Sequence, residues 1–147
     1  LLGAGLRCML VTQAASTAAA VKATHIAQRG VTIAPNSTIQ IRFNIPIAAT
    51  ILSIGVIADD TKPSSAAGTY TLAVAKNPAG ANVNLLNAAT YDLDNTLTVG
   101  SLANPTLTGT TADLTVAAND TIELSFASNN ADLVGAGLRC IVVYRGT

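Results

Sequence analysis

The sequence predicts an all-β fold, an antiparallel β-sandwich of the jelly-roll type. Short runs of β-forming residues alternate between apolar and polar positions, and turn residues separate these runs roughly every ten residues. Strand-like segments do not alternate along the chain with helix-like segments, which a parallel sheet would require. Half of the 147 residues are apolar, which is enough for the core of one domain.

The first half of the chain contains two clear strands. Thr38–Asn44 alternates, with its apolar residues on one face, and Pro46 ends it. Thr50–Ala58 is apolar on both faces, which predicts a central strand covered on both sides. The weaker segments before them are expected to be strands at Leu6–Thr12, Ala23–Arg29 and Val31–Ile33, with Thr12–Lys22 as an extended linker of small residues.

The second half repeats the alternating pattern after the breaker-rich loop Asp59–Gly68. In Thr69–Lys76 and Thr121–Ser128 the residues expected to face inward are Tyr70, Leu72 and Val74, and Ile122, Leu124 and Phe126. Asn87–Asn95 is expected to be a loop or one helical turn. The remaining predicted strands are Val83–Leu86, Thr96–Val99, Thr106–Thr108, Asp113–Val116 and Leu138–Tyr144.

One stretch of the chain occurs twice. Leu1–Val11 is LLGAGLRCMLV and Leu133–Val143 is LVGAGLRCIVV, and every difference exchanges one apolar residue for another. Two explanations fit: Leu1–Val11 is the last strand of an upstream copy, or it is an arm that pairs with a neighbour. Because an unpaired strand is a liability, we expect Leu1–Val11 to add to a sheet, in another protomer or at a domain boundary.

This repeat divides the chain into two expected parts. Residues 1–22 form an N-terminal strand plus a flexible linker, and residues 23–147 form the β-sandwich domain. Since the chain starts inside a strand-like pattern, we expect a processed product or the ordered part of something longer.

The repeated strand also supplies the candidate interface. Arg7 and Arg139 lie at matched places within apolar strands, and a partly buried arginine needs a carboxylate partner, for which Asp132 and Asp113 are candidates. The alternative is a plain outward-facing strand position. The residues expected to form the interface are Leu6, Arg7, Cys8, Met9, Leu10, Val11 and Arg139.

The two cysteines, Cys8 and Cys140, also lie at matched places in the repeat. The favoured interpretation is two buried thiols on equivalent strands. A Cys8–Cys140 bridge is the alternative, and it requires the two copies to lie side by side.

Composition excludes several functions. Charged residues make up 11% of the chain, against about 25% in a typical domain, and there is neither a basic stripe for nucleic acid nor an apolar run for a membrane span. His25 is the only histidine and has no catalytic motif around it. Asp92-Leu93-Asp94-Asn95 begins like a calcium loop but lacks its glycine and distant glutamate, which favours a solvated turn. We expect no catalytic residue, cofactor or metal.

Three phrases carry a resemblance to a known family: Val31–Ser53, Gly68–Lys76 and Leu114–Val134. They resemble the β-sandwich modules of tailed-bacteriophage virion proteins, especially capsid decoration (cement) proteins and head or tail fibre proteins. The resemblance covers roughly residues 31–144. It implies a homotrimer without an active site, bound to the major capsid protein at the capsid surface of the virion. The alternative it leaves open is a fibre or spike module that binds a host-surface glycan.

Overall fold

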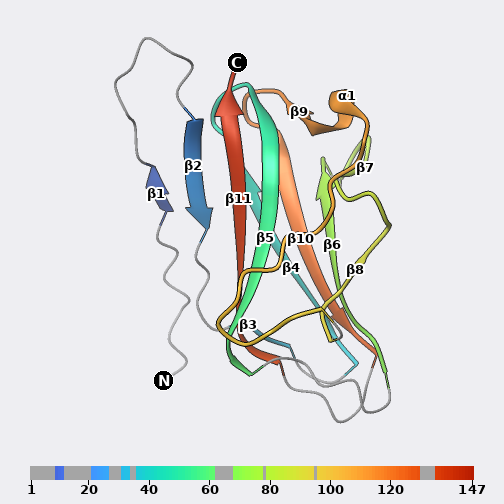
Figure 1. Cartoon of the computed structure of the whole chain (residues 1–147). Helices are drawn as coiled ribbons and strands as arrows, with labels where there is room; N and C mark the ends of the chain where they lie inside the picture. The colour runs from blue at the N-terminus through green and yellow to red at the C-terminus, as the bar shows by residue number, and fades with distance from the viewer. Residues whose placement is uncertain are drawn as a thin grey trace, which may run out of the picture.

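The computed structural model describes residues 9–11, 21–26, 31–33, 36–61, 68–77, 79–94, 96–129 and 135–147. This part of the chain is almost entirely β-structure (Figure 1). Its elements in chain order are β1 (Met9–Val11), β2 (Val21–Ile26), β3 (Val31–Ile33), β4 (Thr38–Asn44), β5 (Ala49–Thr61), β6 (Tyr70–Lys76), β7 (Val83–Asn84), β8 (Tyr91–Asp92), α1 (Thr111–Leu114), β9 (Thr115–Val116), β10 (Thr121–Ser128) and β11 (Gly135–Gly146).

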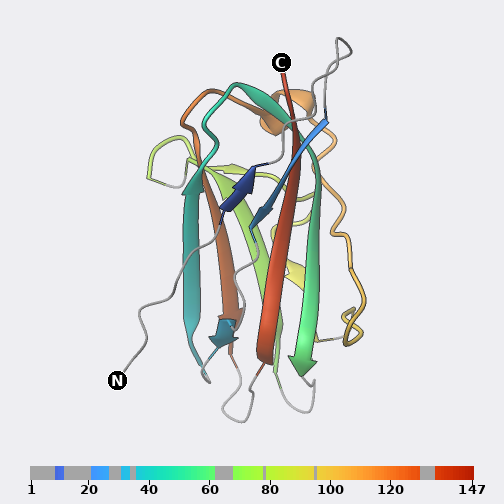
Figure 2. The ribbon, with the colours of Figure 1, turned by 90° about the vertical axis from the view of Figure 1, so that its left-hand side faces the viewer.

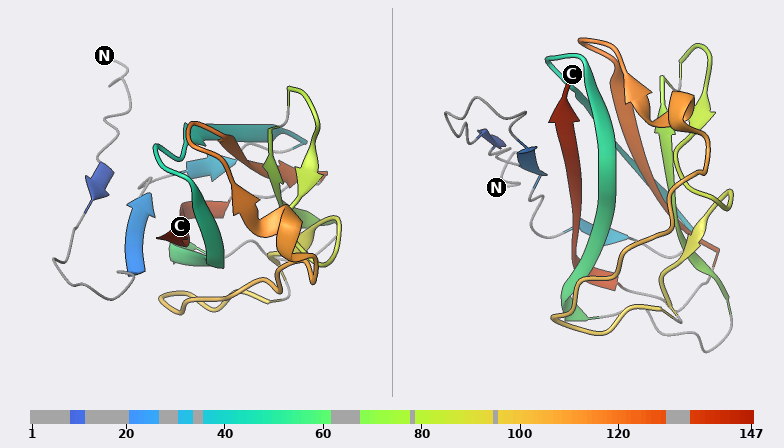
Figure 3. Two further views of the ribbon diagram at one scale, coloured as in Figure 1. Left: turned by 90° about the horizontal axis from the view of Figure 1, so that it is seen from above. Right: turned by 45° about the horizontal axis from the view of Figure 1, so that its top comes forward.

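The strands form two antiparallel sheets that face each other (Figures 1 and 3). Sheet A has the order β1-β2-β11-β5-β9, and β3 also pairs with β11. Sheet B has the order β4-β10-β6-β7, and β8 also pairs with β6. In Figure 2 the long strands β11 (red) and β5 (green) run side by side, to the right of β4 and β10 of sheet B. The predicted all-β sandwich is therefore confirmed.

The strand pairing nests from the ends of the chain toward its middle. β3 pairs with β11, β4 with β10, β5 with β9, and β6 with β7. Successive pairs fall in alternate sheets, as when a long two-stranded ribbon is rolled up. This arrangement is that of a jelly roll, in agreement with the prediction from the strand pattern.

The core lies between the sheets and follows the predicted alternation. All the inward positions predicted in β6 and β10 are buried. From β4, Ile41 is buried, and Ile39 and Phe43 pack against the core while partly exposed. Sheet A contributes a facing layer of buried residues: Ile51, Ile54, Val56 and Ala58 from β5, and Leu138, Cys140, Val142 and Tyr144 from β11.

Between β8 and β10, one predicted strand is wrong and another is only half confirmed, as β9. Thr96–Val99 is not a strand: the backbone N–H of Leu97 donates to the carbonyl of Leu93 at 3.4 Å, and Gly100 follows with a φ of 76°. The first half of the predicted strand Asp113–Val116 is instead the end of helix α1, where the N–H of Asp113 donates to the carbonyl of Thr110 at 3.1 Å. β-forming side chains make a strand only where a partner strand satisfies the backbone.

Other segments differ in extent. Thr106–Thr108 keeps only an isolated bridge, between Leu107 and Leu86, and Asn87–Asn95 contains the short strand β8. Within the described residues no helix has the length and apolar character that crossing a membrane requires.

At the N-terminal side, the predicted first strand is described only as β1. It pairs antiparallel with β2, which in turn pairs with β11, so β1 lies at the edge of sheet A of its own chain. Val21 and Lys22, predicted to end the linker, belong to β2. The rest of Thr12–Lys22 lies outside the described residues.

Candidate interaction surface

The outward face of sheet A is built by alternate residues of β11 and β5. In β11, Leu138, Cys140, Val142 and Tyr144 are buried, whereas Ile141 and Val143, which alternate with them, are partly exposed. Across the ladder, Ile141 pairs with Gly55 and Val143 with Ser53. Because residues paired across strands share a face, these positions all lie on the outside of the sandwich.

Several apolar side chains lie on this outward face. Leu52 and Leu102 are 39% and 49% exposed. A Cβ on Gly55 would lie 2.6 Å from Cδ1 of Leu102, so the glycine allows Leu102 to lie against the outside of β5. We define the outer apolar face as Leu52, Ile57, Leu102, Ile141 and Val143.

Arg139 lies beside the outer apolar face and is paired. Its Nη2 donates to Oδ1 of Asp59 at 2.7 Å, and its Nε lies 2.5 Å from Oδ2 of the same carboxylate. Both side chains are about one-third exposed, at 32% and 29%. A pair this exposed contributes roughly 0–1 kcal/mol to stability but fixes the position of the guanidinium.

The observed partner corrects the prediction for Arg139. Asp113 instead accepts a hydrogen bond from Oγ1 of Thr108 at 3.4 Å, and Asp132 lies outside the described residues. The sequence predicts a loop at Asp59, but β5 continues through this residue to Thr61 because β11 supplies backbone partners there.

The candidate interface residues of the N-terminal copy are only partly described. Leu6, Arg7 and Cys8 lie outside the described residues. Met9, Leu10 and Val11 form β1, and β2 separates them from Arg139 on β11. The structure therefore places the described members in one sheet without bringing β1 and Arg139 together.

Cys140 is a free cysteine in the buried face of β11. Burial raises the pKa of its thiol to about 12, so the thiolate needed for nucleophilic or metal chemistry does not form near neutral pH. The prediction of a buried thiol is confirmed at this position, and Cys8 lies outside the described residues.

Asp92 and Asp94 lie in a turn that is held by hydrogen bonds to Asp92. The backbone N–H of Asp94 donates to Oδ1 of Asp92 at 3.1 Å, and the hydroxyl of Thr96 donates to the Asp92 carbonyl. Burial of Asp94, followed by its side-chain hydrogen bond with Asp92, raises the Asp94 pKa above its usual value. A carboxyl group that favours the protonated form is a poor calcium ligand.

Metal-binding groups do not converge in the part of the chain that the structure describes. There, no three His, Cys, Asp or Glu residues gather as a metal site would require. His25 lies in β2, where it pairs with Leu10 of β1.

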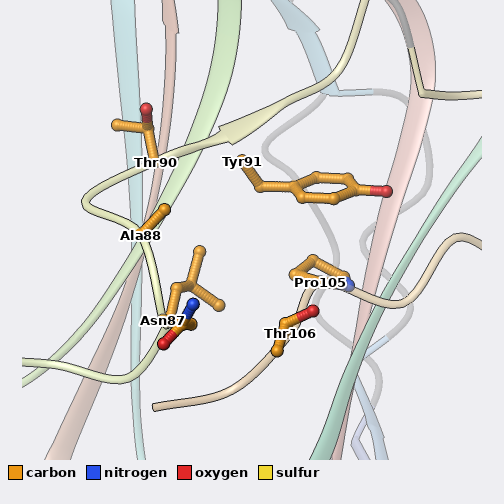
Figure 4. Close-up of a pocket in the computed structure, with 7 residues that line it drawn as sticks. Asn87, Ala88, Thr90, Tyr91, Pro105 and Thr106 are labelled. Carbon is orange, nitrogen blue, oxygen red and sulfur yellow. The ribbon is translucent and has the colours of Figure 1, made fainter.

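A shallow depression near β8 was not anticipated from the sequence. It has a volume of about 170 Å³, and Figure 4 shows the Tyr91 ring extending from β8 over the segment that carries Pro105 and Thr106. Tyr70 and Tyr144 are buried, so Tyr91 is the one tyrosine with an accessible ring. The residues lining the depression are Leu86, Asn87, Ala88, Thr90, Tyr91, Pro105 and Thr106.

A second polar cluster lies on the outward face of sheet B. Glu123 is 7% exposed, and its Oε2 lies 2.5 Å from Nε of Arg42, the residue paired with it across β4 and β10. Nε2 of Gln40 donates to Oε1 of Glu123 at 3.4 Å. This cluster neutralises a buried carboxylate and holds two strands in register.

No protein-family model matches this chain, and neither a curated protein nor a solved structure matches it.

Proposed function

We propose that this chain is a non-enzymatic structural protein of a bacteriophage virion, a capsid decoration or cement protein. Three copies associate, and the trimer binds the major capsid protein at the capsid surface. The jelly roll supports this proposal in a general way, because viral capsid domains and lectin domains use it. A fold alone does not specify a function, so the proposal depends on the surface.

The outer apolar face is the observation that carries the proposal. Leu52 and Leu102 are 39% and 49% exposed, and the Arg139–Asp59 ion pair lies on the same sheet at the level of Ile57, on a chain with only 11% charged residues. Apolar surface bordered by polar groups is typical of protein–protein contacts. A rigid sandwich with such a face spans neighbouring capsid subunits, and many weak contacts then act together as avidity.

The test uses capsids of the parent phage assembled without this protein. We expect the purified chain to bind these capsids and to raise their resistance to heat or chelator. Leu52→Glu/Leu102→Glu places charges on the outer apolar face and should abolish binding while the far-UV spectrum stays unchanged. Ala81→Glu, at an exposed turn before β7, is the matched control. Full binding by the double variant, or none by the wild type, would refute the proposal.

A second candidate is a fibre or spike module that binds a host-surface glycan. The depression beside Tyr91 supports it, because sugars stack on exposed aromatic rings and bind amide and hydroxyl groups such as those of Asn87, Thr90 and Thr106. A glycan array separates the two functions. Specific binding that Tyr91→Ala removes favours the fibre module, and the absence of any binding leaves the decoration protein.

A further inference from the structure

The position that β11 occupies, between β5 on one side and β3 and β2 on the other, demands a glycine near its beginning. Gly137 has a φ of 70°, which side-chain-bearing residues rarely adopt. A Cβ there would lie 2.7 Å from Oδ2 of Asp60 and 3.0 Å from its backbone nitrogen. Because one of these neighbours is backbone, the strand cannot carry a larger residue at this point without a shift.

The same position also selects the next residues of the strand. Leu138, Cys140 and Val142 point into the core and are 0%, 3% and 1% exposed. Arg139, on the opposite face, is held by the carboxylate of Asp59. A strand that matches this position therefore has a glycine, then two residues later an arginine that can pair with Asp59, with apolar residues at the alternate positions.

Leu1–Val11 meets each of these demands. Gly5, Leu6, Arg7 and Cys8 stand where β11 has Gly137, Leu138, Arg139 and Cys140, and Leu10 stands for the buried Val142. Simple alternation would suffice for an unspecific edge strand. The glycine and the arginine go beyond alternation, and both match local features of one position in this sheet.

The place of β1 in its own chain is a different one. β1 pairs with the side of β2 that faces away from β11. Leu10 pairs with His25, whereas its counterpart Val142 pairs with Thr24, so the two copies run along β2 one residue out of register. In a folded copy this position is filled by β11, so Leu1–Val11 can enter it only in a copy whose own β11 has not yet paired.

We propose that Leu1–Val11 of one copy can occupy the β11 position of a second copy, next to its β5 on one side and its β3 and β2 on the other, so that copies of this chain link by strand exchange. Exchange takes place during folding and assembly, because β11, once it has paired in its own chain, fits this position better than Leu1–Val11 does. Tyr144 is buried and pairs with Ile51, whereas the matching residue after Val11 is Thr12. Strand exchange of this kind is a low-cost route to assembly.

The experiment cross-links two full-length variants that each carry one cysteine, in a Cys8→Ala/Cys140→Ala background. The donor carries Val11→Cys, and the acceptor carries Ser53→Cys, because Ser53 pairs with Val143, the counterpart of Val11. The two are mixed in denaturant, refolded together and oxidised. We expect mass spectrometry to find a peptide joined through residues 11 and 53.

Glycine variants show whether the cross-link reports this position. Gly5→Val in the donor should lower the yield about tenfold, on the scale of the cost of left-handed backbone for other residues. Gly137→Val in the acceptor should raise it, since it weakens the resident strand. Gly80→Val in the acceptor is the control, because a Cβ there meets nothing within 4 Å.

Two results would overturn strand exchange. One is the absence of the joined peptide in every mixture, although Ser53→Cys/Val143→Cys within one chain does cross-link. The other is a yield that Gly5→Val leaves unchanged. The unmodified acceptor keeps the test informative if Gly137→Val does not fold. Because no capsid is involved, failure here is separate from failure of the proposed function.

Discussion

Three asparagines fix turns of the sandwich through backbone that few residues adopt. Asn36, Asn77 and Asn119 have φ values of 47°, 51° and 70°, and asparagine tolerates this left-handed region better than most residues. Asn77 also joins two turns: its Nδ2 donates to Oδ1 of Asp120 at 3.1 Å, and its Oδ1 accepts from the N–H of Thr121. Each of these turns was predictable from sequence, but this link between them was not.

Asp94 gives the stability of the protein a distinct pH dependence. Its pKa is raised in the folded chain, chiefly by burial. The folded chain therefore binds this proton more tightly than the unfolded chain does. Its contribution is fully present below the ordinary carboxyl pKa and is lost as pH rises through the folded-state value. Asp94→Asn removes this titration. The free energy of unfolding by urea should therefore fall less between about pH 4 and pH 7 than in the wild type.

The control for this measurement is Asp60→Asn, which removes an exposed carboxylate instead. Equal pH dependence in Asp94→Asn and the wild type would contradict the raised pKa of Asp94.

Cys140 should resist thiol reagents as long as the chain is folded. The raised pKa of about 12 and the burial of the side chain keep its thiol protonated and inaccessible. In a Cys8→Ala background, we expect no reaction with an aromatic disulfide reagent at pH 8 and full reaction of one thiol in guanidinium chloride. Rapid labelling of the folded variant would show that β11 does not bury this residue.

Among the elements, β10 is central to sheet B, paired with β4 on one side and β6 on the other. The alternation of its sequence correctly predicted which residues face the core. Phe126 is fully buried. Changing it to Ala should lower the free energy of unfolding by about 3–5 kcal/mol. Urea unfolding measures this loss, and Val99→Ala, at a 47% exposed residue, should change stability little. Equal effects of the two changes would place Phe126 outside the core.

Long alternating strands were predictable because one buried face imposes a period of two on the sequence. Short elements were not. Thr96–Val99 has the composition of a strand but pairs with no strand among the residues that the structure describes, and β9 is limited to Thr115–Val116 because α1 includes the residues before it. The Arg139–Asp59 pair was missed for a related reason, since only the register between β5 and β11 brings these residues together.

At the scale of the whole molecule, the nesting of strand pairs joins distant parts of the chain. β11 lies between β2 and β5, so the last strand completes the sheet that the first strands begin. Composition and turn spacing predicted the jelly roll class, whereas the position of the repeated strand in the sheet required the structure. Because the second copy of the repeat is β11, the position of β11 in sheet A is also the position that the sequence of Leu1–Val11 matches.

The proposal of an assembling structural protein is tested most directly by the mass of the purified chain in solution. Because the outer apolar face is exposed in a single copy, we expect light scattering to give about three times the chain mass of 14.8 kDa, and Leu52→Glu/Leu102→Glu to lower it toward one chain. A mass of one chain at every concentration would contradict the account.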